Sequence, residues 1–111
     1  MDDVTQMCHV TVPGELDLHT VRTLLPVLDE AAATGAPVIV DGTDLTFLDS
    51  TALSHLHRHH QAAVQRGVPF VLAVQHPAVL KLLRITGLAD VIPVFADLDA
   101  ATTHVRFSND S

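Results

Sequence analysis

A short apolar run followed closely by a segment of helical periodicity constrains the fold of this chain more than any other feature. The run is residues 37–41, Pro-Val-Ile-Val-Asp, and its β-branched composition is typical of a buried strand. Downstream, apolar positions are spaced as on one face of an α-helix, at Leu53, Leu56, His60 and Val64. The order is therefore strand, loop and helix, with Ser50 and Thr51 at the start of the helix.

A second helical stripe precedes this run. It is formed by Val21, Leu24, Leu25, Leu28, Ala31 and Ala32. Asp17 or Thr20 is the expected cap of this helix, because short polar side chains can bind the free N–H groups of the first turn. Gly35 is its expected end, since glycine readily adopts the left-handed conformation that closes a helix.

Two further strands and two further helices are expected in the C-terminal half. In order, the sequence predicts a strand at residues 68–74, a helix at 77–86, a short strand at 91–95 and a helix at about 97–106. Pro77 suits the first position of its helix, and Gly87 suits the position just after the last turn. No segment is repeated.

Strands that alternate with helices usually pair in parallel through right-handed crossovers. We therefore expect a small α/β fold, with a mostly parallel sheet of four to five strands and about four helices. A length of 111 residues suits a single domain over residues 1–111, with its core at about 10–106. The shared core is predicted to contain Val38, Val40, Leu56, Phe70, Leu72 and Leu82.

Charge and cysteine content exclude several classes of protein. The net charge of −7, counted with neutral histidine, disfavours nucleic-acid phosphate or an anionic membrane as the main partner. Cys8 is the only cysteine, so no internal disulfide is expected. No signal-peptide pattern opens the chain, and no apolar run is long enough to span a bilayer. We expect a cytoplasmic protein with no direct contact to nucleic acid or membrane.

The residues alone leave two interpretations of Ser50. A helix start exposes unpaired N–H groups and the positive end of the helix dipole, so a hydroxyl there can serve only as a cap. It can also be a reactive or modified group. A hydrolase is disfavoured because the chain lacks a Gly-x-Ser-x-Gly elbow, and no glycine-rich phosphate loop is present. We expect neither enzymatic activity nor a cofactor.

Histidines gather on the helix that follows Ser50. They are His55, His57, His59 and His60. His55 and His59 lie one turn apart and could share a divalent ion, but no cysteine and no His-Glu-x-x-His arrangement accompanies them. His60 falls on the apolar stripe and is predicted to pack in the core, with the other three on a solvated face. We expect no metal site.

Three segments, in register along the chain, carry a known pattern. Residues 47–53 read Phe-Leu-Asp-Ser-Thr-Ala-Leu, residues 14–17 read Gly-Glu-Leu-Asp, and residues 79–88 form a late helix that ends in Gly-Leu. Together they resemble the bacterial anti-sigma factor antagonists, which are free-standing STAS domains, over about residues 10–95. Ala52 stands where that family most often has Gly. The resemblance implies a STAS-like fold, with the first N-terminal strand missing or reduced to residues 4–6.

The resemblance also implies a function. Ser50 would be the phosphoacceptor, and the partner-binding residues would be Glu15, Asp17, Asp49, Thr51 and Ala52. The implied partner is an anti-sigma factor serine kinase that also sequesters a sigma factor. The unphosphorylated protein would occupy that kinase and free the sigma factor, a mechanism called partner switching.

Two alternatives remain open. One is a non-switching STAS scaffold or interaction module of a stress-sensing or transport assembly, with Ser50 acting only as a helix cap. The other is a small-ligand binder.

Overall fold

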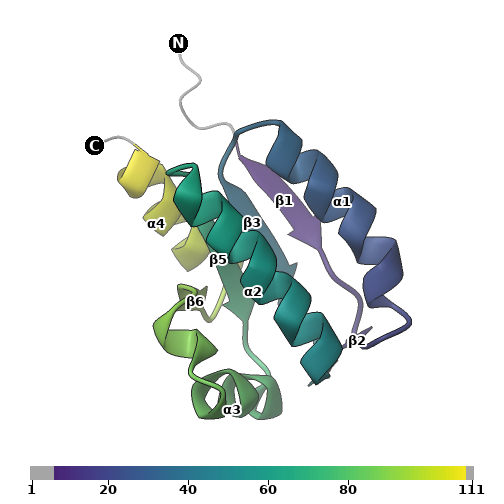
Figure 1. Ribbon diagram of the computed structural model, residues 1–111. Helices are drawn as coiled ribbons and strands as arrows, with labels where there is room; N and C mark the ends of the chain where they lie inside the picture. The colour runs from purple at the N-terminus through teal and green to yellow at the C-terminus, as the bar shows by residue number, and fades with distance from the viewer. Residues whose placement is uncertain (1–6, 110–111) are drawn as a thin grey trace.

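The computed structural model describes residues 7–109, which alternate between strands and helices (Figure 1). The strands are β1 (Cys8–Thr11), β2 (Glu15–Leu16), β3 (Val38–Gly42), β4 (Phe47–Leu48), β5 (Phe70–Val74) and β6 (Val94–Phe95). The helices are α1 (Val21–Ala33), α2 (Ser50–Gln65), α3 (Pro77–Ile85) and α4 (Leu98–Asn109), with a short 3-10 helix η1 at Leu88–Asp90. The strand stub expected at residues 4–6 lies outside the described residues.

The strands form two parallel sheets. The main sheet has the order β1-β3-β5-β6, and every neighbouring pair in it is parallel. β2 and β4 form a separate two-stranded parallel sheet that the sequence did not predict. The predicted α/β class, with a mostly parallel sheet and four helices, is confirmed.

The main sheet is covered on both faces, and the alternation of side chains along β3 and β5 explains how. Val38 and Val40 point into the larger core beneath α1 and α2, whereas Ile39 between them belongs to a second cluster on the other face. α4 covers that second face with Ala101 and Val105. In Figure 1, α1 and α2 accordingly lie on one side of the sheet and α4 on the other.

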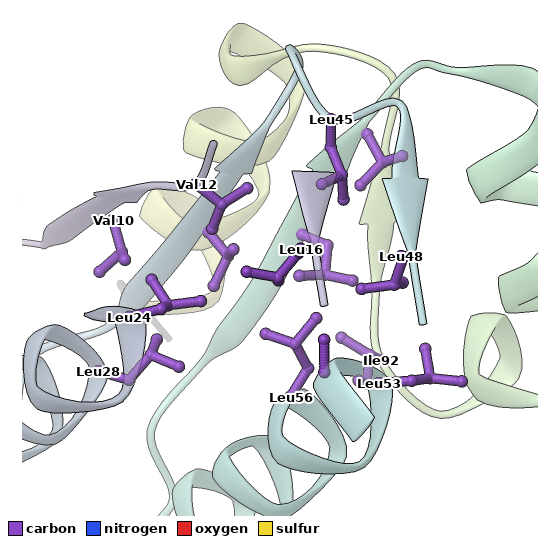
Figure 2. Packing of buried hydrophobic residues seen from close by; sticks show 14 of the residues in the cluster. Val10, Val12, Leu16, Leu24, Leu28, Leu45, Leu48, Leu53, Leu56 and Ile92 are labelled. Atoms are coloured by element: carbon purple, nitrogen blue, oxygen red, sulfur yellow. The ribbon is translucent and has the colours of Figure 1, made fainter. Parts of the chain in front are cut away.

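The small sheet is attached to the molecule by its inward side chains. Leu16 and Leu48 are partners in the β2–β4 register and are both buried in the larger core. Figure 2 shows them pointing toward the same interior as Leu53 and Leu56 of α2. Because alternate residues of a strand face opposite ways, their neighbours Glu15 and Phe47 face outward.

Two helix positions differ from the prediction by one residue. Leu82 is only partly buried at the edge of the core, while Leu83 is fully buried, four residues after the buried Val79. On α2, Val64 is 60% exposed and Ala63 is buried in its place. In both helices the buried face is rotated slightly from the face predicted from the largest apolar side chains. Helical periodicity, rather than residue size, decides which positions face the sheet.

Two predicted elements have different limits. The last strand, expected at residues 91–95, is confined to Val94–Phe95, because the N–H groups of Val91 and Ile92 still donate to the Leu88 carbonyl oxygen of η1. β5 begins at Phe70, whereas this strand was expected from residue 68. Gly87 has a φ of 83°, so it adopts the left-handed conformation predicted for the end of α3.

Leu83→Ala should lower the free energy of unfolding by about 2–5 kcal/mol, the usual cost of truncating a fully buried leucine. Leu82→Ala is the matched control and should cost clearly less, since part of that side chain already faces solvent. Urea denaturation of both variants and the wild type measures the difference. Equal losses would show that α3 does not pack on Leu83 as described.

Candidate functional site

The Gly-Glu-Leu-Asp turn and the start of α2 lie side by side (Figure 1). The Thr46 backbone N–H donates to the Gly14 carbonyl oxygen at 2.7 Å, and the Asp49 N–H donates to the Leu16 oxygen at 3.1 Å. Between these two bonds lies the β2–β4 pairing. Two segments about thirty residues apart in sequence therefore form one continuous surface.

The carboxylate of Asp49 joins the two segments directly. Its Oδ1 accepts a hydrogen bond from the Ala52 N–H at 2.9 Å, and its Oδ2 accepts one from the Leu18 N–H, also at 2.9 Å. Asp49 has extended backbone angles and is the N-cap of α2. The interpretation of Ser50 as the cap is therefore wrong: Ser50 is the first residue inside the helix, and its neighbour does the capping.

Asp17 organises the turn on the other side of this contact. Its Oδ1 accepts hydrogen bonds from the N–H groups of Thr20 and His19, each at 2.9 Å. These backbone donors, Thr20 first and His19 second, lower the pKa of Asp17 below its usual value, because they stabilise the charged form. Thr20 is the N-cap residue of α1, but its side chain makes no capping bond; its hydroxyl lies 3.0 Å from the Glu15 carbonyl oxygen.

The predicted site residues differ in how far a partner can reach them. Ser50 and Glu15 are exposed, and Asp49 and Thr51 are partly buried. Ala52 is fully buried, at 0% exposure, with its side chain in the larger core. The structure thus brings the predicted residues together, but it keeps the Ala52 side chain beneath the surface that a partner would contact.

Two apolar residues of this surface were missed from the sequence. Phe47 is 49% exposed and Leu18 is 48% exposed. Phe47 and Leu48 are consecutive apolar residues in the sequence, although the two face opposite ways in β4. The signal that could have found Phe47 is the period of two in a strand, but a two-residue strand is too short to reveal it.

The histidines of α2 have different surroundings. His60 is buried, at 7% exposure, and its ring meets Phe70 edge-on with centroids 6.0 Å apart, which confirms the packing prediction. His59 is not a freely solvated residue: its Nε2 lies 3.1 Å from Asp29 Oδ1 across the α1–α2 contact, and its Nδ1 lies 2.9 Å from the His55 carbonyl oxygen. Among the residues that the structure describes, no group of three or more His, Cys, Asp or Glu side chains could hold a metal ion.

Burial lowers the pKa of His60 below its ordinary value, and the nearby His57 adds to this effect by charge repulsion. Its Nδ1 is buried and has no hydrogen-bond partner among the described residues. His60 therefore resists protonation in the folded protein.

Comparisons with known proteins agree on the family. The STAS domain family model matches residues 1–101. The chain belongs to the STAS domain family. Of the helices in the described part of the chain, none is both long and apolar enough to cross a membrane.

Two relatives are described as antagonists of anti-sigma factors. A protein of Mycobacterium tuberculosis (strain ATCC 25618 / H37Rv), provisionally named an anti-anti-sigma factor, is 31% identical over 91 residues. The match covers 79% of this chain but 62% of that protein, so the chain spans less than two thirds of the relative's length. The crystal structure of an anti-sigma factor antagonist from Mycobacterium paratuberculosis is similar with a TM-score of 0.81 and 28% identity, covering 88% of this chain and 84% of that one.

Protein stability should fall as the pH drops below about 6.5, the ordinary pKa of histidine, in part because of His60. The folded-state pKa of His60 is lowered, so in this range the unfolded chain takes up a proton that the folded protein resists. His60→Phe removes the titrating group while keeping a ring against Phe70, and it should make the free energy of unfolding less dependent on pH.

Urea denaturation at several pH values between about 5 and 8, the range around the ordinary histidine pKa, measures this dependence. His9→Phe, a change of the same chemistry at an exposed position of β1, is the control and should follow the wild type. If His60→Phe loses stability with acid as steeply as the wild type does, burial of His60 is not a source of the pH dependence.

Proposed function

We propose that this chain is an anti-sigma factor antagonist whose binding to its partner is controlled by phosphorylation of Ser50. The observation that carries the proposal is the position of Ser50. It is exposed at the first residue of α2, on the surface that Asp49 assembles from the two segments that resemble the family motifs. The relatives named above support the antagonist function.

The proposed partner is an anti-sigma factor that is also a serine kinase. The unphosphorylated chain occupies it and releases the sigma factor, so the chain acts in transcription regulation in a bacterial cytoplasm. Glu15, Asp17, Asp49 and Thr51 form the contact surface around Ser50. The chain acts as one STAS domain and needs no cofactor, nucleic acid or membrane for this role.

The chain is proposed to be a substrate rather than an enzyme. A serine nucleophile needs a base within hydrogen-bond reach. Two carboxylates of this surface already accept hydrogen bonds from the backbone: Asp49 caps α2 and binds Leu18, and Asp17 closes its own turn. Both carboxylates are therefore already engaged in hydrogen bonds that stabilise this surface.

A phosphate on Ser50 should leave the fold intact. It would add a charge of about −1.5 to −2 at neutral pH. The N-terminus of α2 favours an anion by about 0.3–1 kcal/mol, and a carboxylate about 4 Å away opposes it by about 1 kcal/mol in water. These effects nearly cancel in the free protein.

The same phosphate should have a large effect in the complex. There it must lose its water against a surface that fits a neutral hydroxyl, and a buried charge without a partner costs several kcal/mol. Since about 1.4 kcal/mol is a tenfold change in affinity, the phosphorylated chain should dissociate.

The scaffold alternative rested on Ser50 as a simple cap, and it loses that support because Asp49 is the cap. A small-ligand binder has no specific observation in its favour. The proposal therefore depends on Ser50 as the regulated position.

Ser50→Asp should weaken binding to the nucleotide-loaded anti-sigma kinase at least tenfold, because the added carboxylate imitates part of the phosphate charge. Ser50→Ala should bind like the wild type and resist phosphorylation. Ser54→Asp is the matched control: Ser54 is also exposed on α2, one turn further on, and its charge should change affinity much less.

Titration calorimetry measures the affinities, and mass spectrometry of the chain after incubation with the kinase and ATP locates the phosphate. Wild-type affinity in Ser50→Asp, or a phosphate on Thr51 in place of Ser50, would contradict the proposed switch.

A further inference from the structure

We propose that Phe47 and Leu18 are a pair of apolar anchors that dock into an apolar socket on the anti-sigma partner, and that the socket has a positively charged rim. This inference rests on the proposed function, because it describes the partner of the same site. It adds a source of affinity that is separate from the phosphorylated residue.

The exposure of the apolar pair, Leu18 and Phe47, follows from the arrangement of the β2–β4 region and not from loose packing. In the β2–β4 sheet, Leu16 and Leu48 take the inward positions at 0% and 5% exposure. Phe47, which precedes Leu48, must then face outward. Each anchor leaves about half of its side chain in water, which is a cost unless another surface covers it.

The backbone holds both anchors in place before a partner arrives. The Phe47 N–H donates to the Gly14 oxygen at 3.3 Å, and the Leu18 N–H donates to Asp49 Oδ2 at 2.9 Å. A side chain on a fixed backbone loses less entropy when it docks than one on a mobile loop. Binding energy from these anchors is therefore retained in the complex.

Both anchors are linked to Ser50 through Asp49. Leu18 is hydrogen-bonded to the Asp49 carboxylate, Phe47 is two residues before Asp49 in the chain, and Ser50 follows it. Apolar side chains that surround a hydroxyl exclude water from it in a complex, and they make a charge at the same point costly. The apolar pair would therefore increase the loss of partner affinity that phosphorylation of Ser50 causes.

The charge around the pair defines the rim of the socket. Glu15, the register partner of Phe47, is exposed, and the ionised Asp17 directly precedes Leu18. Arg22 is the only Lys or Arg before residue 58 in the sequence. A partner surface with Lys or Arg around an apolar centre complements this pattern, and the opposite charges would speed association.

Other exposed large apolar residues lie on other elements, and two of them, Val64 and Val91, line one open pocket. They are Val27 on α1, Val64 on α2, Ile85 on α3, Val91 after η1 and Phe107 on α4. Single exposed apolar residues are ordinary on protein surfaces. Leu18 and Phe47 differ because they lie on two segments that are hydrogen-bonded to each other.

Titration calorimetry against the nucleotide-loaded anti-sigma kinase tests the anchors. Phe47→Ala should weaken binding at least tenfold and Leu18→Ala about threefold, since aromatic anchors usually contribute more than aliphatic ones. Val64→Ala, at a residue more exposed than either, is the control and should bind like the wild type. All three should keep the wild-type melting temperature within a few degrees, because each removes a side chain that is about half exposed or more.

The dependence of binding on ionic strength distinguishes the contribution of the apolar anchors from that of the charged rim. Raising the ionic strength should weaken wild-type and Phe47→Ala binding by similar factors, while Glu15→Gln should reduce this dependence on salt. Equal affinities for wild type, Phe47→Ala and Leu18→Ala, together with a loss in Ser50→Asp, would overturn the anchors and leave the proposed function standing.

Other results would contradict the proposed function or the assigned partner. If Ser50→Asp binds like the wild type, or the wild type does not bind the kinase, the proposed function fails and the anchor assignment fails with it. If sedimentation shows that the wild type alone is a dimer and that Phe47→Ala is a monomer, the pair covers a second copy of this chain, and the assigned partner is wrong.

Discussion

The bridging carboxylate of Asp49 is the interaction on which the candidate site depends. One oxygen binds the first turn of α2 and the other binds the turn before α1, so a single side chain fixes two distant segments against each other. Hydrogen bonds to a charged carboxylate are stronger than those between neutral groups. Without this bridge, Ser50 would still begin a helix, but the turn that carries Glu15 and Leu18 would lose its side-chain link to the start of α2. It would then depend on the short β2–β4 pairing, the hydrogen bonds to Gly14 and the burial of Leu16.

The hydrophobic core supports the bridge from below. Leu16 and Leu48 anchor the small sheet in the same core that binds α2 to the main sheet (Figure 2). Burial of these side chains leaves Phe47 and Glu15 on the outer face, so the composition of the contact surface follows from the packing beneath it. The positions of Ser50 and of the proposed anchors thus both follow from the packing of the small sheet and α2 on the same core.

The main elements could be predicted from sequence because their periodicity is local. The apolar run at residues 37–41, the stripe through Leu56 and His60, and the Pro77 and Gly87 limits of α3 each depend on neighbouring residues. β2 and β4 could not be found in this way, because a two-residue strand has no measurable period and exists only through pairing with a distant segment. The same reason explains the missed Phe47, whose exposure depends on that pairing, while Leu18 lies in the turn that follows β2. The resemblance located Ser50 and the turn beside it, but only the structure assigns the cap to Asp49 and places the Ala52 side chain in the core.

Amide hydrogen exchange in Asp49→Ser tests most directly whether the carboxylate bridge holds the site together. A serine can still cap α2 with its single oxygen, but it cannot also reach the Leu18 N–H. The account predicts that exchange of the Leu18 amide becomes at least tenfold faster, while the Ala52 amide and the amides of β3 and β5 keep nearly their wild-type protection. If the Leu18 amide stays as protected in Asp49→Ser as in the wild type, the turn is held by other contacts and the central role given to Asp49 is wrong.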